Sequence, residues 1–257
     1  MEELRVTLVQ TEILWESIEE NLLRYTEKIN QVQNTDLIVL PEMFSTGFTM
    51  NPEPVAEKES GKAVQWMIKM ATSKKIALTG SLVIEENKNY YNRLFFVFPD
   101  GGYVTYNKKH LFSLAKEHAN YSAGSEKIII NYKGFKICPL ICYDLRFPVW
   151  ARNVEDYDVL IYIANWPDKR VKAWDALLKA RSIENMCYTI GVNRVGKDGN
   201  DLFYSGHSAV YDALGDKIST QFQETELIET IALSKESLLE TRKNLGFLRD
   251  RDEFSLK

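Results

Sequence analysis

Residues 135–148 read FKICPLICYDLRFP, an apolar run that ends in a cysteine and then turns at once to polar residues. The apolar part, Phe135 to Ile141, is interrupted only by Lys136 and Pro139 and predicts a buried strand. Cys142 would then sit on the turn that follows the strand. A thiol at such a turn is held rigidly and can still be reached from a cleft, which is the placement that a covalent nucleophile needs.

Two other segments carry reactive side chains next to predicted strands. Glu42 directly follows LIVLP (residues 37–41), where partial desolvation raises the pKa of a carboxyl group and helps it exchange protons near neutral pH. The alternative for Glu42 is an acid that only bonds a backbone amide at the strand end. Lys108 and Lys109 follow a predicted hairpin, and the apolar residues after them would draw one lysine inward toward an anionic partner. Spacing alone leaves open which lysine this is.

Composition narrows the class of protein. The chain has 257 residues, 45% of them hydrophobic, and no Pro/Ser/Gly-rich linker, so we expect a single domain over residues 1–257. The net charge is -4 and basic residues are dispersed, which argues against a nucleic-acid partner. The N-terminus lacks the apolar core of a signal peptide, and no apolar run approaches the ~20 residues of a membrane helix, so no membrane partner is expected.

The cysteines are an odd number at no metal-like spacing, namely Cys138, Cys142 and Cys187. This favours a cytoplasmic protein with reduced thiols. In an extended strand Cys138 and Cys142 would share a face at roughly 13 Å, too far for a disulfide. Cys138 and Cys187 lie in apolar surroundings and are expected to be inert. Cys142 could equally be a buried core residue, but the polar residues after it favour a functional role.

The histidines do not add a recognisable site. His110, His118 and His207 are scattered, without the spacing of a zinc site. A Cys–His hydrolase would need one of them beside Cys142, and nothing in the sequence requires this.

Strand-like and helix-like segments alternate along the chain, with hairpins between some of them. The pattern predicts an α/β (α+β) layered sandwich of mixed sheets and not a purely parallel, doubly wound sheet. Ser17 and Glu20 predict a capping box, and residues 196–199 a loop. No glycine-rich nucleotide motif is present. The predicted strands are 4–10, 36–41, 76–84, 90–98, 103–106, 128–132, 135–141, 158–164, 188–193 and 208–212. Four helices are predicted: one after residue 17, one over 64–71, one that begins near 148 and one over 172–186.

Several motifs, in order along nearly the whole chain, resemble the carbon–nitrogen hydrolase (nitrilase) superfamily. They are LPEMFSTGF (40–48), YNKKHLF (106–112), ICYDLRFP (141–148), ANWP (164–167), ARSIEN (180–185) and SGHSAVYDALGD (205–216). The resemblance implies a triad of Glu42, Lys108 and Cys142, because the lysine of the family lies two places before the histidine. Asn107 stands where the family usually has arginine.

The same resemblance implies further features of the fold and the site. A second glutamate, Glu117 in EHANYSAG (117–124), would support the triad. The fold would be a four-layer αββα sandwich, nitrilase-like, and the chain would form a homodimer. Neither a metal nor an organic cofactor would be required. The thiolate of Cys142 would form a thioester with an amide substrate, Glu42 would move the protons, and Lys108 with the backbone N–H of Tyr143 would stabilise the oxyanion.

The motifs around Cys142 and Trp166 are most similar to the omega-amidase branch, which hydrolyses monoamides of small dicarboxylic acids such as 2-oxoglutaramate and 2-oxosuccinamate. Arg146 would grip a substrate carboxylate, or else form a salt bridge with Asp144. Three aromatic side chains would wall the substrate slot: Phe44, Phe147 and Trp166. An N-carbamoyl-amino-acid (carbamoyl-β-alanine type) amidohydrolase, another aliphatic amidase and a binding module without activity are the alternatives.

Overall fold

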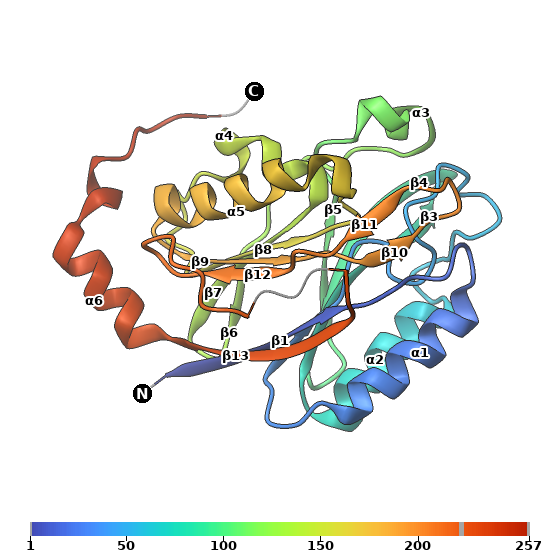
Figure 1. The fold of residues 1–257 in the computed structure, drawn as a ribbon, viewed down its shortest axis with the longest axis horizontal. Helices are drawn as coiled ribbons and strands as arrows, with labels where there is room; N and C mark the ends of the chain where they lie inside the picture. The colour runs from blue at the N-terminus through green and yellow to red at the C-terminus, as the bar shows by residue number, and fades with distance from the viewer. Residues whose placement is uncertain (1, 221–223, 256–257) are drawn as a thin grey trace.

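Two mixed β-sheets lie face to face, and helices cover the outer face of each sheet (Figure 1). The structure is a computed structural model that describes residues 2–220 and 224–255. The layers follow the order helices, sheet, sheet, helices, so the expected four-layer αββα sandwich of mixed sheets is confirmed.

The first sheet has the strand order β13-β1-β2-β3-β4-β5. Its two central pairs, β1 with β2 and β2 with β3, are parallel, and the other pairs are antiparallel. The strands span Glu3–Gln10 (β1), Leu37–Val39 (β2), Ala77–Glu86 (β3), Asn89–Val97 (β4), Tyr103–Asn107 (β5) and Leu227–Ser234 (β13).

The second sheet has the strand order β12-β9-β8-β7-β6. The pairs β7 with β8 and β8 with β9 are parallel, and the outer pairs are antiparallel. Its strands span Ile130–Tyr132 (β6), Phe135–Ile141 (β7), Val159–Ile163 (β8), Tyr188–Val192 (β9) and Ala209–Tyr211 (β12). A separate hairpin joins β10 (Val195–Lys197) to β11 (Phe203–Ser205).

The helices divide between the two outer faces. Two of them, α1 (Ile18–Gln31) and α2 (Lys62–Lys74), lie against the first sheet, and their apolar residues form a core with its outer face. On the other side α4 (Pro148–Ala151) and α5 (Val171–Asn185) cover the second sheet. The remaining helices are α3 (Glu117–Asn120), α6 (Lys235–Leu245) and the 3-10 helices η1 (Ser113–Ala115), η2 (Cys142–Arg146), η3 (Asp168–Arg170) and η4 (Phe247–Asp250). No helix in the described part of the chain is long and apolar enough to cross a membrane.

The main core lies where the inner faces of the two sheets meet. Because side chains alternate along a strand, Leu4, Val6 and Leu8 of β1 all point inward and are fully buried. They share one core cluster with Ile137 and Leu140 of the opposite sheet. The two sheets are therefore packed firmly against each other, and the ends of their strands are fixed relative to one another.

The predicted elements correspond to observed ones, with four corrections. Ser17 precedes α1, but its side chain makes no capping bond. Residues 196–199 include part of β10 and are not all loop, and the short strand β11 that pairs with β10 was missed. Both β13 and α6 were missed, since β13 mixes exposed and buried positions without strict alternation. Finally, the chain leaves the extended conformation at Cys142, which removes the predicted shared face with Cys138.

Candidate active site

Cys142 is the first residue of η2, the 3-10 helix that directly follows strand β7. Its φ of 45° falls in the left-handed region, which is uncommon for a residue with a side chain and is held only by strong surroundings. Cys142 is 9% exposed and lines a cavity, whereas Cys138 and Cys187 are fully buried elsewhere in the core. Burial, followed by the negative charge of Glu42, raises the pKa of the Cys142 thiol well above its usual value.

The expected partners of Cys142 lie side by side in the interior. Lys108 Nζ is 2.8 Å from Glu42 Oε1 and 3.0 and 2.9 Å from the two carboxylate oxygens of Glu117. All three side chains are completely buried. Carboxylate, ammonium and thiol therefore form one contiguous cluster, although they come from widely separated parts of the chain.

The structure resolves which of the adjacent lysines points inward. Lys108 has no exposed surface, while Lys109 lies partly exposed, with its Nζ 5.4 Å from the centre of the Trp150 ring. Burial alone would lower the pKa of Lys108, but the charges of Glu117 and Glu42 outweigh it and raise the pKa above its usual value. The Lys108 side chain is thus held as an ammonium ion.

The two carboxylates are in different environments. Burial raises the pKa of Glu117, and the neighbouring Glu42 raises it further, while Lys108 opposes both. Glu117 also accepts a hydrogen bond from the backbone N–H of Phe112, at 2.6 Å. It therefore anchors the segment before α3 to the buried lysine.

Two asparagines fix the orientation of Glu42. Asn92 Nδ2 donates to Glu42 Oε1 at 2.7 Å, and the backbone N–H of Asn165 donates to Oε2 at 2.8 Å. The Asn165 side chain also donates to the backbone carbonyl of Glu42, at 2.5 Å. Because both carboxylate oxygens are held by donors, Glu42 has one defined position beside the thiol.

A third buried carboxylate, that of Asp144, joins the segments that carry the lysine and the cysteine. Its Oδ1 lies 3.0 Å from the backbone N of His110 and 2.8 Å from its Nδ1. Its Oδ2 accepts from the Tyr106 hydroxyl at 2.7 Å and from the backbone N–H of Ile141 at 3.0 Å. These partners lie two residues on either side of the lysine and next to the cysteine. His110 is thus engaged with Asp144 and is not the partner of the thiol.

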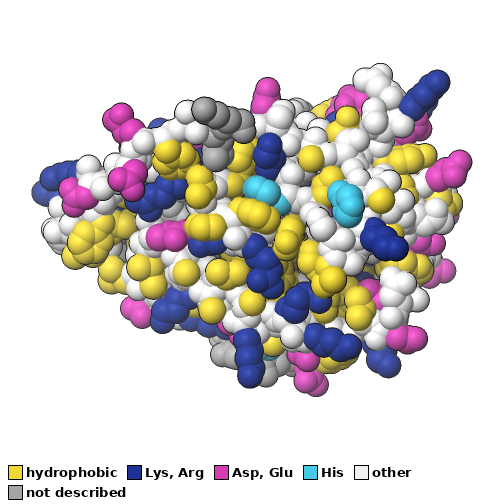
Figure 2. All heavy atoms as spheres, turned by 90° about the horizontal axis from the view of Figure 1, so that it is seen from above, with side chains coloured by type: hydrophobic (Ala, Val, Ile, Leu, Met, Phe, Trp, Pro, Cys, Tyr) yellow, Lys and Arg dark blue, Asp and Glu magenta, His cyan; other side chains and the backbone are white. Residues whose placement is uncertain are grey.

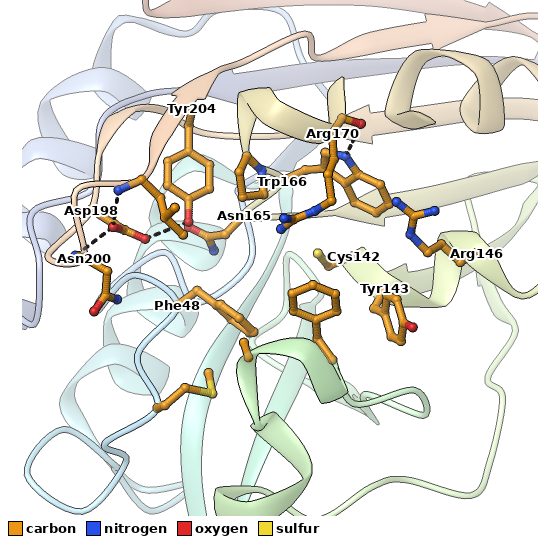
Figure 3. A pocket seen from close by; sticks show the side chains of 15 residues that line it. Phe48, Cys142, Tyr143, Arg146, Asn165, Trp166, Arg170, Asp198, Asn200 and Tyr204 are labelled. Carbon is orange, nitrogen blue, oxygen red and sulfur yellow. Dashed lines mark hydrogen bonds between the residues drawn. The ribbon is translucent and has the colours of Figure 1, made fainter. Parts of the chain in front are cut away.

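Cys142 connects the cluster to a cavity of about 280 Å³ (Figure 3), whereas Glu42, Lys108 and Glu117 are fully buried and do not line it. The lining comes from five segments: the stretch after Glu42, the stretch before α3, the 3-10 helix η2, the stretch after β8, and the β10–β11 hairpin. The residues that line the cavity are Phe48, Met50, Phe112, Ala115, Cys142, Tyr143, Arg146, Asn165, Trp166, Pro167, Arg170, Asp198, Asn200, Leu202 and Tyr204.

Two guanidinium groups face this cavity. The Arg146 guanidinium lies 4.9 Å from the centre of the Trp166 ring, and that of Arg170 lies 5.0 Å from the centre of the Phe112 ring. Neither arginine has a carboxylate partner within the described residues. The alternative of a salt bridge between Arg146 and Asp144 is therefore wrong, because His110, Tyr106 and Ile141 already occupy Asp144.

Two of the three aromatic residues expected around the cavity lie elsewhere. Phe44 packs between the first sheet and its helices, with its ring centre 5.3 Å from Tyr25 and 5.6 Å from Trp66. Phe147 stacks on the His110 ring at 3.7 Å and does not line the cavity. Trp166 does line it. The error arises because nearness in sequence to Glu42 or Cys142 does not determine the side of the backbone on which a side chain lies.

Several residues of the site carry no sequence signal of their own. Asn92 lies within an ordinary strand, and Arg170 resembles any surface arginine before a helix. Phe48 and Tyr204 are aromatic residues among many. Asn165 belongs to the ANWP segment, where its position directly after the apolar strand β8 is the one signal that could have marked it.

Comparisons with known proteins give a consistent family. The model of the carbon–nitrogen hydrolase family matches residues 5–243. The Omega-amidase YafV of Yersinia enterocolitica is 40% identical over 257 residues, covering 100% of both chains. The 2-oxoglutaramate amidase of Bacillus subtilis is 34% identical over 218 residues, covering 82% of this chain and 83% of that one. The crystal structure of XC1258 from Xanthomonas campestris, a CN-hydrolase superfamily protein with an arsenic adduct in its active site, matches with a TM-score of 0.97 and 39% identity over 100% of both chains.

The Asp144 network makes a prediction about stability. In Asp144→Ala the Tyr106 hydroxyl, the His110 donors and the Ile141 N–H lose their shared acceptor inside the protein. We expect the free energy of unfolding to fall by about 2–3 kcal/mol, as measured by urea denaturation. Asp216→Ala, in an exposed turn, is the control and should change it by less than about 0.5 kcal/mol. Equal stability of the two variants would show that Asp144 does not hold these segments together.

Proposed function

Because this chain belongs to the carbon–nitrogen hydrolase family and is a hydrolase of carbon–nitrogen bonds, we propose that it cleaves the terminal amide of a small dicarboxylic acid monoamide. The substrates would be of the 2-oxoglutaramate or 2-oxosuccinamate type, and the products a dicarboxylate and ammonia. One observation carries the proposal: Cys142, with the buried Glu42 and Lys108 beside it, lines a cavity together with two guanidiniums that have no carboxylate partner among the described residues. No cofactor is required for this chemistry.

In the first half of the proposed reaction Glu42 accepts the proton of the Cys142 thiol as the sulfur attacks the amide carbon. The raised pKa of the thiol means that a base must be at hand, and the neighbouring carboxylate of Glu42 supplies it. When the C–N bond breaks, Glu42 returns the proton to the departing nitrogen. Ammonia leaves, and the acyl group stays on Cys142 as a thioester.

The negative charge on the substrate oxygen needs donors that are already in position. Lys108 is one, because its ammonium is buried and oriented by two carboxylates. The backbone N–H of Tyr143 is the other; it lies in the first turn of η2, where amide hydrogens have no acceptor within the helix. Fixed donors in a site without water stabilise such charge strongly.

In the second half Glu42 takes a proton from a water molecule, which then attacks the thioester. Glu117 supports this step by holding the ammonium of Lys108 from the far side. The same oxyanion donors act again, and the acid is released. Arg146 and Arg170 would bind the distant carboxylate of the substrate, with Trp166 as part of the wall.

We also propose that residues 1–257 form one domain, that the protein is cytoplasmic, and that it forms a homodimer. The cysteines are all free, in keeping with a reducing compartment. The face formed by α4 and α5 carries apolar side chains among basic ones, as Figure 2 shows from above. Val149, Val154 and Ile183 are 52%, 39% and 46% exposed. Such a face supports a symmetric contact with a second copy.

The choice of lysine makes a kinetic prediction. In Lys108→Ala the oxyanion loses one donor, so we expect kcat for 2-oxoglutaramate to fall by about 10²-fold to 10³-fold. Lys109→Ala is the matched control and should change kcat by less than about twofold, since its ammonium only lies over the Trp150 ring. Circular dichroism checks that both variants fold. The reverse ranking would show that Lys109 carries the chemistry.

The carboxylate anchor predicts a difference between substrates. Arg146→Met keeps the packing on Trp166 but removes the charge, so KM for 2-oxoglutaramate should rise about tenfold or more. KM for an uncharged aliphatic amide such as butyramide should change little. Arg170→Met should behave in the same way, and Lys169→Met, which removes an exposed charge outside the cavity, is the control. An equal rise in KM for both substrates would contradict the anchoring role.

The homodimer is tested by sedimentation velocity. The wild-type chain should sediment as a dimer, and Val149→Asp should shift it toward the monomer because a charge enters an apolar contact. Leu23→Asp, which alters a 61% exposed residue of α1 on the opposite face, is the control. A monomeric wild type, or a dimer unaffected by Val149→Asp, would contradict the proposed contact.

A further inference from the structure

The cavity extends to both sides of Cys142, although a primary amide needs only one side. Figure 3 shows Tyr143 and Arg146 on one side of the sulfur, Asp198, Asn200 and Tyr204 on the other, and the guanidinium of Arg170 between these two groups. We call the first group the arginine half. The second group, with Leu202, is the hairpin half, because it belongs to the β10–β11 hairpin.

The charges of the two halves are opposite. The arginine half carries the guanidinium of Arg146, which has no carboxylate partner among the described residues, and the guanidinium of Arg170 lies between the two halves. The hairpin half carries the carboxylate of Asp198, which is held by the Tyr204 hydroxyl at 2.8 Å and by the backbone N–H groups of Asn200 and Leu202 at 2.8 and 3.0 Å. A substrate carboxylate is attracted to the first half and repelled by the second, so the substrate has one favoured direction.

That direction places the leaving nitrogen toward the hairpin half. Glu42, which protonates the nitrogen in the proposed mechanism, is buried next to Asn165, whose backbone N–H donates to its carboxylate and whose side chain donates to its backbone carbonyl. Asn165 lies between Cys142 and the hairpin residues in Figure 3. A substituent on the nitrogen would therefore continue into the hairpin half, where Asn200 is exposed and opens the cavity to solvent.

We propose that the hairpin half is a leaving-group subsite, and that the enzyme also hydrolyses N-substituted monoamides of small dicarboxylic acids whose amine part is neutral or cationic. This inference rests on the proposed function, since it uses the same thiol and the same orientation. Cys142 sulfur attacks the carbonyl carbon, and the C–N bond breaks as Glu42 gives its proton to the nitrogen. The amine leaves through the hairpin half. Water then cleaves the thioester to the dicarboxylate and regenerates the thiol.

The first experiment compares amine release from succinamate, N-methylsuccinamate, N-(2-aminoethyl)succinamate and N-(carboxymethyl)succinamate. We expect kcat/KM for the methyl and aminoethyl compounds within about tenfold of that for succinamate, because the pocket already has room for the added groups. The carboxymethyl compound should be at least about tenfold poorer than the aminoethyl one, owing to Asp198. Turnover of succinamate with none of N-methylsuccinamate would overturn the subsite and leave the proposed function intact. No turnover of any of them, nor of 2-oxoglutaramate, would overturn the proposed function itself.

Variants in the hairpin test the location of the subsite. Leu202→Trp fills the hairpin half, so kcat/KM for N-methylsuccinamate should fall about tenfold more than that for succinamate. Leu214→Trp, in an exposed turn outside the cavity, is the matched control and should leave the ratio of the two unchanged. Asp198→Asn keeps an acceptor for the turn but removes the charge, and it should abolish the preference for the aminoethyl over the carboxymethyl compound. Unchanged ratios in both hairpin variants would place the amine elsewhere.

Discussion

The structure depends on a buried ammonium ion. A charge without water is costly unless other charges surround it, and Lys108 is stable in the interior only because Glu42 and Glu117 contact it directly. This requirement fixes the position of each carboxylate to within a hydrogen bond. It also sets the charges around the Cys142 thiol, whose pKa is raised by burial and by Glu42 and lowered by Lys108. The geometry needed for amide hydrolysis is thus the same geometry that makes burial of the lysine tolerable.

The fold supplies this arrangement through the ends of strands in two packed sheets. Glu42 follows β2 of the first sheet, and Cys142 and Asn165 follow the neighbouring parallel strands β7 and β8 of the second. Packing between the sheets sets the distance between these ends. The carboxylate of Asp144 accepts hydrogen bonds from Tyr106 of the first sheet and from Ile141 of the second sheet. These bonds help to hold the left-handed backbone conformation of Cys142.

Local patterns in the sequence predicted a layered sandwich, most strands, and Glu42 and Cys142, because an apolar run followed by a reactive polar residue is a local signal. The four layers, the choice of Lys108 over Lys109 and the role of Glu117 came from the family resemblance. Contacts between distant side chains carry no such signal. Asn92, the acceptor role of Asp144 and the position of Arg170 depend on which strands become neighbours and which way each side chain turns. Phe44 was misplaced for the same reason. The short strands of the β10–β11 hairpin were missed because their pattern is too brief to distinguish from a loop.

The thiol of Cys142 determines which bond of the substrate breaks. The opposite charges of the arginine half and the hairpin half determine the direction in which the substrate lies in the cavity. Transfer of the acyl group to Cys142 is the central claim. The most direct measurement is peptide mapping by mass spectrometry after an acid quench of the protein turning over 2-oxoglutaramate. We expect the peptide that contains Cys142 to gain the mass of the acyl group without the amide nitrogen. Turnover with an acyl group on another residue, or undiminished turnover by Cys142→Ala, would contradict the mechanism.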